Sequence, residues 1–150
     1  FERPGLEADD CLGILSTMGD NKLIKGDRVI VSIDKDFKQI PGKTFNPGHP
    51  ELGVQEISPQ KADYWHIYQT LIGDKTDGYS GCPGIGPVKA TKAIANLVGK
   101  AAWDAVLECF KDAGFGPEEA LTQARVARIL RASDYDFNKK EPILWNPPTV

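Results

Sequence analysis

The sequence is poor in the side chains that disulfides and zinc sites require. It has three cysteines and two histidines among its 150 residues. Cys11, Cys82 and Cys109 are widely spaced and form no C-x-x-C pair, so we expect reduced intracellular thiols rather than a disulfide framework or a zinc site. His49 and His66 form no ligand pair and are expected to be structural or surface residues.

The sequence also lacks a long apolar run and an initiator methionine. No stretch is long enough to span a bilayer, and the first ten residues turn acidic where a signal peptide would be apolar. We therefore expect neither a membrane span nor a leader. Met18 is the only methionine, which indicates part of a longer protein or a processed product. The hydrophobic content of 41% is sufficient for a folded core.

An excess of positive charge is absent as well. The formal net charge is −3, which by itself argues against a nucleic-acid partner. Seven of the 21 acidic residues, however, are candidate metal ligands, and setting these aside leaves 14 acidic against 18 basic residues. The acidity is therefore predicted to be a local site on a mildly basic body.

The order of apolar and turn residues predicts an α/β core followed by a mainly helical region. Residues 28–33 are a short, nearly continuous β-branched run, which predicts a strand buried on both faces of a parallel sheet. Residues 53–57 are expected to form an edge strand, and apolar spacing predicts helices at 6–19, 58–72, 87–98, 100–113 and 117–132. The expected domains are an α/β segment at 1–57, a helical region at 58–133 and a packed tail at 134–150.

Three acidic groups stand at the ends of predicted elements. Their members are Glu7, Asp9 and Asp10 at a helix start, Asp34 and Asp36 at a strand end, and Asp74 and Asp77 after a helix. Open α/β sheets bind ligands at the carboxyl ends of their strands, and an Asp-x-Asp pair in extended chain shares one face. The simpler explanations are complementation of a helix dipole for the first group and a helix cap for Asp36.

Seven carboxylates in one place would repel one another unless cations neutralised them. Oxygen-only clusters favour magnesium or manganese over zinc. Two such ions about 3.5–4 Å apart can clamp a phosphodiester, one activating water and the other stabilising the leaving oxygen. The sequence therefore favours Mg²⁺ or Mn²⁺ as cofactor and phosphodiesters as substrates.

A glycine turn follows the third acidic group. Gly84–Gly86, three further residues and Ala90 have the form of a helix–hairpin–helix, in which Ile85 anchors the turn and Gly86 lets backbone N–H groups approach a phosphate. An ordinary helical corner with a glycine cap is the simpler explanation. A dinucleotide fingerprint is excluded, because no strand precedes the turn and the third glycine is missing. The expected DNA-binding residues are Gly84, Ile85, Gly86, Val88 and Lys89.

Arginines recur every three residues in the last predicted helix, at Arg125, Arg128 and Arg131. Such a stripe usually indicates a solvated face, and the alternative is an edge that follows phosphates. The sequence leaves both interpretations open.

Three ordered motifs have a counterpart in a known family. They are Glu-Ala-Asp-Asp at 7–10, Ser-Ile-Asp-Lys-Asp-Phe at 32–37, and Gly-Asp-x-x-Asp-Gly at 73–78 followed by Gly-Ile-Gly. Together they resemble the structure-specific 5′ nucleases, which include flap endonucleases, the 5′-nuclease domain of bacterial DNA polymerase I and phage 5′–3′ exonucleases. Trp-His-Ile-Tyr-Gln-Thr at 65–70 and Ala-Arg-Ile-Leu at 127–130 look most like the exonucleases of short-tailed phages.

The resemblance implies a PIN-like 5′-nuclease fold and a two-metal nuclease that cuts DNA at a 5′ end or flap junction, leaving a 5′ phosphate. The turn Gly84–Gly86 would hold the DNA backbone, in many members with a potassium ion on its carbonyls. In this family the metal ligands would be Glu7, Asp9, Asp10, Asp34 and Asp36, with Asp74 and Asp77 chiefly at the second metal. We take Asp10, Asp34 and Asp36 as the catalytic carboxylates.

The departure from the family is at the front of the chain. Family members carry an N-terminal half with the first strands, two further aspartates and a basic arch, and none of these precedes Phe1. We therefore expect the carboxyl-terminal half of such an enzyme, which would need the other half in cis or in trans and would cleave poorly alone. The complete enzyme is expected to be a cytoplasmic monomer, in a bacterial host if it is phage-encoded.

Two other functions compete with this interpretation. A phosphatase with an aspartyl nucleophile would use Asp34 as nucleophile and Asp36 as acid, but it leaves the first acidic group and the glycine turn without a role. A non-catalytic DNA-binding module would use only the hairpin, and such a module gains nothing from seven mutually repelling carboxylates.

Overall fold

The computed structural model of the chain describes residues 3–21 and 24–150. These residues form two compact units. The first unit contains the chain up to Ala62 together with Ile129–Leu144, and the second contains Asp63–Arg128 together with Trp145–Val150. Each unit is therefore built from segments that lie far apart in the sequence. No helix in the described ranges has the length and apolar character that crossing a bilayer requires.

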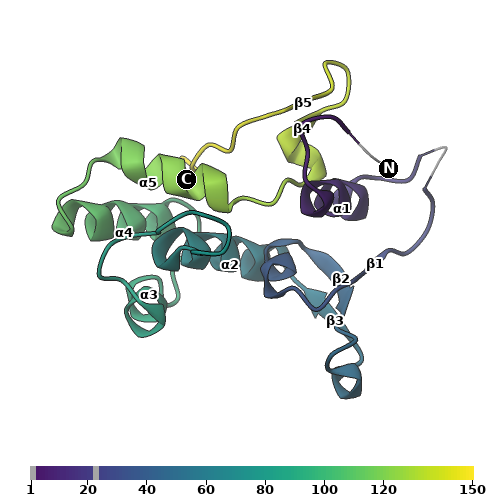
Figure 1. The fold of residues 1–150 in the computed structure, drawn as a ribbon, viewed down its shortest axis with the longest axis horizontal. Coiled ribbons are helices and arrows are strands. Elements are labelled where there is room, and N and C mark those ends of the chain that lie inside the picture. Colours follow the sequence, from purple (N-terminus) through teal and green to yellow (C-terminus); the bar gives the residue numbers. More distant parts are fainter. Residues whose placement is uncertain (1–2, 22–23) are drawn as a thin grey trace. The chain divides into compact units, whose positions relative to one another are not determined.

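The first unit combines helix α1 (Ala8–Thr17) with a three-stranded sheet (Figure 1). The strands are β1 (Val29–Val31), β2 (Gly42–Phe45) and β3 (Val54–Ile57). Strand β1 pairs with β2 in parallel and β2 pairs with β3 antiparallel, in the order β1-β2-β3. The α/β class predicted from the sequence is confirmed, and so is the edge position of β3, but the sheet is mixed rather than wholly parallel.

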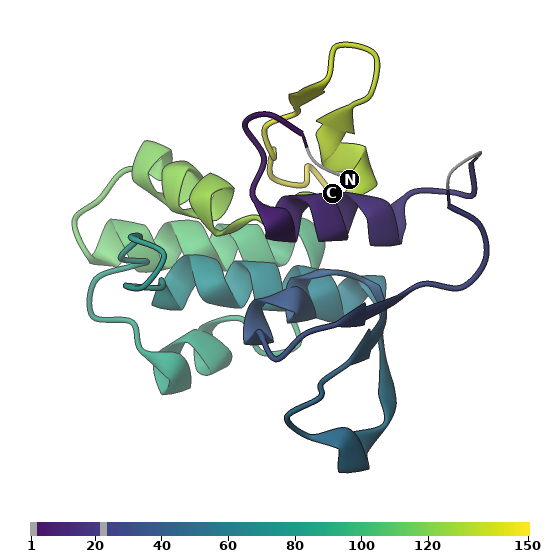
Figure 2. The same ribbon diagram turned by 45° about the vertical axis from the view of Figure 1, so that its right-hand side comes forward.

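Short elements complete the first unit. They are the 3-10 helices η1 (Lys35–Gln39), η2 (Pro50–Leu52) and η3 (Ala132–Asp134), and the two-residue strands β4 (Tyr135–Asp136) and β5 (Glu141–Pro142). In both ribbon views η3 lies beside α1, although more than a hundred residues separate them in the sequence (Figures 1 and 2). The later segment is therefore part of the same folded unit as the first acidic motif.

Strand β1 is not buried on both faces, contrary to the prediction. Ile30 is 6% exposed and packs with Phe37 and Ile40, whereas Val29 is 41% and Val31 62% exposed. The reason is that the apolar cluster covers only the face to which Ile30 points, so Val29 and Val31 on the other face are left exposed. A continuous β-branched run cannot distinguish a strand buried on both faces from one whose second face is open.

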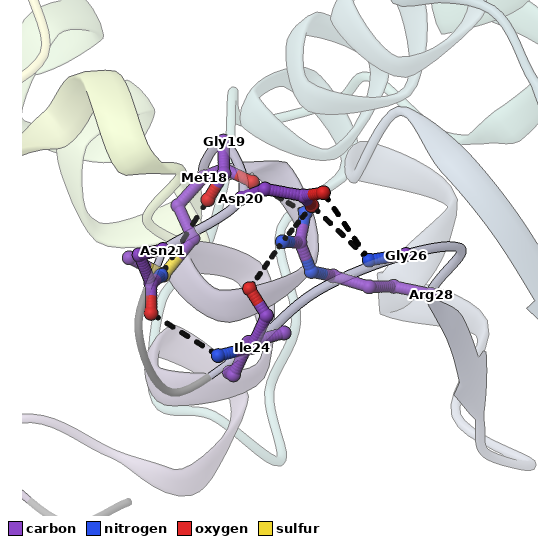
Figure 3. Close-up of polar contacts among 7 residues, drawn as sticks. All are labelled: Met18, Gly19, Asp20, Asn21, Ile24, Gly26 and Arg28. Carbon is purple, nitrogen blue, oxygen red and sulfur yellow. Dashed lines mark hydrogen bonds and ion pairs between the residues drawn. The ribbon is translucent and has the colours of Figure 1, made fainter.

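The connection between α1 and β1 is tied together by polar contacts (Figure 3). The Asp20 carboxylate accepts hydrogen bonds from the Gly26 N–H at 3.2 Å and from the Arg28 guanidinium at 3.0 Å. Another guanidinium nitrogen of Arg28 donates to the Met18 carbonyl at the end of α1. The Arg28 side chain is 19% exposed but that of Asp20 is 62% exposed, so this ion pair is only partly shielded from solvent.

The second unit is helical. Helix α2 (Pro59–Ile72) leads into it and is followed by α3 (Pro87–Ala93), α4 (Gly99–Asp112) and α5 (Pro117–Ala127), of which α4 and α5 run side by side (Figure 2). Its core includes Leu71, Ile94, Val106 and Phe110, each no more than 1% exposed. The predicted bounds of α2 and α4 hold to within a residue, whereas α3 and α5 end about five residues early.

The last residues of the chain pack on these helices. The Trp145 ring lies 4.9 Å from the His66 ring and 5.4 Å from the Trp103 ring, measured between centroids. His66 is 1% exposed, and its Nε2 lies 2.8 Å from the Ala124 carbonyl oxygen. This histidine is therefore a buried structural residue. In the first unit, by contrast, Phe137 of the tail that was predicted to be packed is 43% exposed.

Candidate functional site

The third acidic group lies in a tight loop that follows α2. Asp74 and Tyr79 exchange backbone hydrogen bonds of 2.9 and 3.0 Å across the loop, and the Thr76 N–H donates to Asp74 Oδ1 at 2.8 Å. Carboxylate oxygens of Asp74 and Asp77 lie within 4.8 Å of each other. The loop thus holds two carboxylates close enough to share one divalent cation.

Two glycines close the mouth of this loop and were not singled out by the sequence analysis. Gly73 and Gly81 have φ angles of +69° and +65°, and a Cβ on Gly81 would lie 2.4 Å from the Gly73 nitrogen. The Gly81 N–H donates to the buried side-chain carbonyl of Gln123 at 2.8 Å. The loop therefore depends on backbone contact that any side chain would block. The available signal was the pair of glycines that enclose the segment from Asp74 to Ser80.

The thiol of the cysteine beside this loop has low reactivity. Burial raises the pKa of the Cys82 thiol to about 11, and nearby Cys109 and Asp112 add to that shift. Because this pKa lies far above neutrality, Cys82 remains a protonated thiol and a poor metal ligand or nucleophile.

The glycine turn precedes α3. Gly84 has φ +75°, and a Cβ at Gly84 or Gly86 would meet no atom within 4 Å, so the backbone on this side is open. Ile85 packs partly against the core of the second unit, and Ala90 is fully buried. These placements agree with the anchoring and close-packing roles expected of a helix–hairpin–helix, while contact with a duplex remains a prediction.

The outer residues of the turn are also accessible. Val88 is 83% exposed. The Lys89 ammonium donates to the Gly84 carbonyl at 3.0 Å, which holds a positive charge against the turn. This carbonyl belongs to the set that the family resemblance assigns to potassium.

The first acidic group surrounds the start of α1. Glu7 is the N-cap residue and is exposed, and Asp9 is half-buried. The Asp10 carboxylate accepts the Glu7 N–H at 3.4 Å through Oδ2 and the Leu130 N–H at 3.0 Å through Oδ1. Asp10 therefore has a structural role that the sequence did not predict, because one of its partners lies 120 positions away.

The second acidic group follows β1. Asp34 is the N-cap of η1, and its Oδ1 accepts the Asp36 N–H at 2.8 Å. The simpler explanation of Asp36 as a helix cap does not hold, because η1 begins at Lys35 and its N-cap is Asp34. Asp34 is exposed and Asp36 half-buried, so both stay accessible to a ligand.

The donor set fits a hard divalent cation. All seven side chains are carboxylates that are exposed or half-buried, and oxygen donors of this kind suit Mg²⁺ and Mn²⁺. Within the first unit the structure brings Glu7 together with Asp10, and Asp34 with Asp36. Within the second unit it brings Asp74 together with Asp77.

Two arginines of the predicted stripe have neither of the expected roles. Arg125 donates to the Trp145 carbonyl at 3.0 Å and to Asn146 Oδ1 at 3.1 Å. Arg131 lies beyond the end of α5 and donates to the Gln39 carbonyl through Nε and Nη2. These guanidinium groups hold the fold together, so they form neither a solvated helix face nor an edge available to phosphates.

Comparison with known proteins agrees with the motifs. The chain is 33% identical to the exodeoxyribonuclease of Enterobacteria phage T3, over 98% of this chain and 57% of that protein. It is also 33% identical to the exonuclease of Escherichia phage T7, over 98% of this chain and 58% of the phage protein. The 5′-3′ exonuclease of Aquifex aeolicus is 34% identical over 63% of this chain and 34% of its own length.

No family model matches the chain. The chain spans little more than half the length of the two phage relatives. Similarity to DNA polymerase I of Mycobacterium tuberculosis, at 31% identity over the full chain, covers 17% of that much longer protein. The predicted resemblance to the structure-specific 5′ nuclease family is therefore confirmed, and it extends over nearly the whole chain.

Proposed function

We propose that this chain is the carboxyl-terminal portion of a divalent-metal-dependent 5′–3′ exonuclease or flap endonuclease that hydrolyses DNA and leaves 5′ phosphates. The observation that carries the proposal is similarity to named exonucleases over 98% of the chain, with the acidic motifs in the expected order. The paired carboxylates of Asp74 and Asp77 support it, because a purely structural loop gains nothing from placing two like charges within 4.8 Å.

Two divalent ions, when bound, would supply Lewis-acid stabilisation and a metal-activated water. The protein would hold these ions with carboxylates that differ in how their side chains are fixed. Asp34 and Asp74 each accept a backbone N–H through Oδ1, which fixes the orientation of the side chain. Asp36, two residues after Asp34, and Asp9, in the first turn of α1, are half-buried and would complete the ligand set. Catalysis would rest on Asp10, Asp34 and Asp36.

The glycine turn would hold the DNA backbone. The open space above Gly84 and Gly86 lets a phosphate approach backbone N–H groups, and Lys89 supplies a nearby positive charge. A potassium ion on the turn carbonyls would fit the same contact with phosphate. By binding the duplex, the turn would thereby determine which phosphodiester bond is cleaved.

Gly86→Val tests this role of the turn. Gly86 has φ −98° and ψ −177°, which valine adopts readily, and its Cβ would meet no atom within 4 Å. We expect a folded protein whose affinity for duplex DNA falls about tenfold, since the branched side chain occupies the path of the phosphate. Gly116→Val is the matched control, because Gly116 also caps a helix that begins with proline. Equal loss of duplex and metal binding, measured by fluorescence anisotropy and Mn²⁺ titration, would indicate misfolding instead.

Further chain would pair with the unpaired edge of β1. Val31 and Ile33 are 62% and 73% exposed, and in the described residues β1 has a strand neighbour only on the β2 side. Exposed apolar side chains on an edge strand favour pairing with another strand. The phage relatives are longer than this chain, and we propose that the corresponding N-terminal half, in cis or in trans, fills this position.

The deciding experiment is a cleavage assay on a 5′-labelled flap and on a 5′-labelled duplex. With Mg²⁺ and the N-terminal half supplied, we expect metal-dependent release of 5′-phosphorylated products, and little cleavage without that half or with a chelator. DNA binding without cleavage by the complete protein would favour the non-catalytic module. Products that carry a 5′ hydroxyl would contradict the proposed hydrolysis.

A further inference from the structure

The segment Ile129–Ala132 is held in an unusual way within the first unit. It is neither helix nor strand where it leaves α5, and Arg131 has extended backbone angles, φ −105° and ψ 172°. Each of its four consecutive backbone N–H groups donates to a side-chain acceptor. The acceptors are Gln39 Oε1 at 3.5 Å, Asp10 Oδ1 at 3.0 Å, Asp134 Oδ2 at 3.0 Å and Thr17 Oγ1 at 2.8 Å.

Helix α1 presents one stripe to this segment. Asp10, Gly13 and Thr17 recur at i, i+3 and i+7, which places them on the same helix face. Asp10 and Thr17 accept hydrogen bonds from Leu130 and Ala132, and between them a Cβ on Gly13 would lie 2.2 Å from the Leu130 carbonyl oxygen. Backbone is therefore packed directly on backbone at Gly13, between two hydrogen bonds to side chains of α1.

The end of η1 is bound to the same segment. The Gln39 carbonyl accepts from Arg131 Nε at 3.2 Å and from Nη2 at 2.7 Å, and Gln39 is 1% exposed. The Ile129 side chain packs against Phe37 and Ile40, the core residues that η1 and its cap contribute. Buried, charge-assisted bonds of this kind resist separation more strongly than neutral surface contacts.

We propose that Ile129–Ala132 is a positioning strut for the metal centre, with Thr17 and Arg131 as its positioning residues. The strut joins α1, whose first turn carries Asp9 and Asp10, to η1, which begins beside Asp34 and Asp36. Like charges on the two elements repel, and Mg²⁺ demands nearly ideal ligand geometry, so a fixed spacing between them strengthens metal binding. The proposal rests on the proposed function, because it assigns the strut to that centre.

Thr17→Val is the sharpest test. Valine has the same shape but removes the acceptor of the Ala132 N–H, and Thr17→Ser restores it. Thr122→Val is the matched control, because the hydroxyl of Thr122 donates to the carbonyl four residues before it, as that of Thr17 does, and Thr122 lies in the other unit. The measurement is Mn²⁺ binding, followed by the electron paramagnetic resonance signal of unbound Mn²⁺ at a temperature where circular dichroism shows each variant folded.

We expect Thr17→Val to weaken Mn²⁺ binding about tenfold, the size of one lost buried hydrogen bond, with Thr17→Ser and Thr122→Val within about twofold of the parent. A folded Thr17→Val that binds Mn²⁺ like the parent would overturn the strut. If Thr17→Val does not fold, Arg131→Lys replaces it, since lysine keeps the charge and loses the paired contact with the Gln39 carbonyl.

Hydrogen exchange on the unaltered chain tests the strut without any substitution that could disturb folding. By reciprocity, Mn²⁺ should slow exchange of the Leu130 and Ala132 amides at least about tenfold if the strut and the metal centre are coupled. Unchanged exchange with Mn²⁺ bound would overturn the proposal. Mn²⁺ binding that is absent, or unaffected by Asp9→Asn, would instead overturn the metal centre itself and the strut with it.

Discussion

Replacing Asp34 and Asp74 together with asparagine is expected to reduce Mg²⁺-dependent cleavage by the complete enzyme at least about 1,000-fold. Each unit loses one charged ligand, so both acidic regions are weakened at once. The fold should survive, because an asparagine Oδ1 can still accept the Asp36 N–H at position 34 and the Thr76 N–H at position 74.

The matched control is Asp27→Asn combined with Asp104→Asn. These carboxylates are exposed, lie one in each unit, and pair with Lys43 and Lys100 at 2.6 Å, so the change in net charge is the same. We expect cleavage by this control to stay within about threefold of the parent, since surface pairs contribute little. Single-turnover rates on the flap substrate provide the measurement. Parent-like cleavage by the Asp34 and Asp74 variant would make the metal assignment wrong.

Gly81→Ala is expected to lower the free energy of unfolding by at least about 3 kcal/mol. Two costs combine, because alanine is disfavoured at φ +65° and its Cβ would overlap the Gly73 nitrogen at 2.4 Å and the Leu71 carbonyl oxygen at 2.6 Å. The neighbours are backbone atoms of the loop mouth, so they cannot rotate away. The loop that carries Asp74 and Asp77 would open, and the hydrogen bond from Gly81 to Gln123 would be lost.

Gly78→Ala separates the conformational cost of alanine at a positive φ from the cost of the steric overlap. Gly78 has φ +81°, but its Cβ would meet no atom within 4 Å, so alanine there should cost only the conformational term of about 1–2 kcal/mol. Urea unfolding of the chain, followed by circular dichroism, measures both variants. Equal destabilisation by the two substitutions would show that contact at the loop mouth adds nothing to stability.

Local pattern was sufficient to predict much of the fold. Helices α2 and α4 have strong signals at both ends, a proline near the first turn of α2 and a glycine after α4, and their bounds agree with the prediction. Strand β3 was predicted at an edge and lies there. These elements are specified by neighbouring residues, which a single sequence displays directly.

The errors in the predicted secondary structure arise where residues far apart in the sequence determine the conformation. Strand β2 was not predicted, because its stretch of the sequence is rich in proline and glycine, and pairing with β1 and β3 makes it a strand. Helix α5 was predicted to continue to residue 132, but it ends at Ala127 because the following backbone N–H groups bond to side chains from other elements. Helical spacing of Leu130 and Arg131 gave no sign of that competition.

In the candidate site, too, some residues could be predicted from local sequence and others could not. Its acidic residues could be named from motifs, because carboxylate spacing is a local property of the sequence. The groups that support them could not. Gln123 reaches Gly81 across 42 positions and Asp10 reaches Leu130 across 120, and neither contact has a local signature. Only a three-dimensional structure places these side chains beside their backbone partners.

The strut has an uneven sequence requirement. At positions 130 and 132 it contributes backbone N–H groups, which every residue except proline possesses. The acceptors at Asp10 and Thr17, and the absent side chain at Gly13, are by contrast specific to residue type. The residues whose identity determines the conformation of Ile129–Ala132 therefore lie mostly in α1, more than a hundred residues upstream. We expect α1 to tolerate few substitutions at these positions and positions 130 and 132 to tolerate many, although the two segments form one contact.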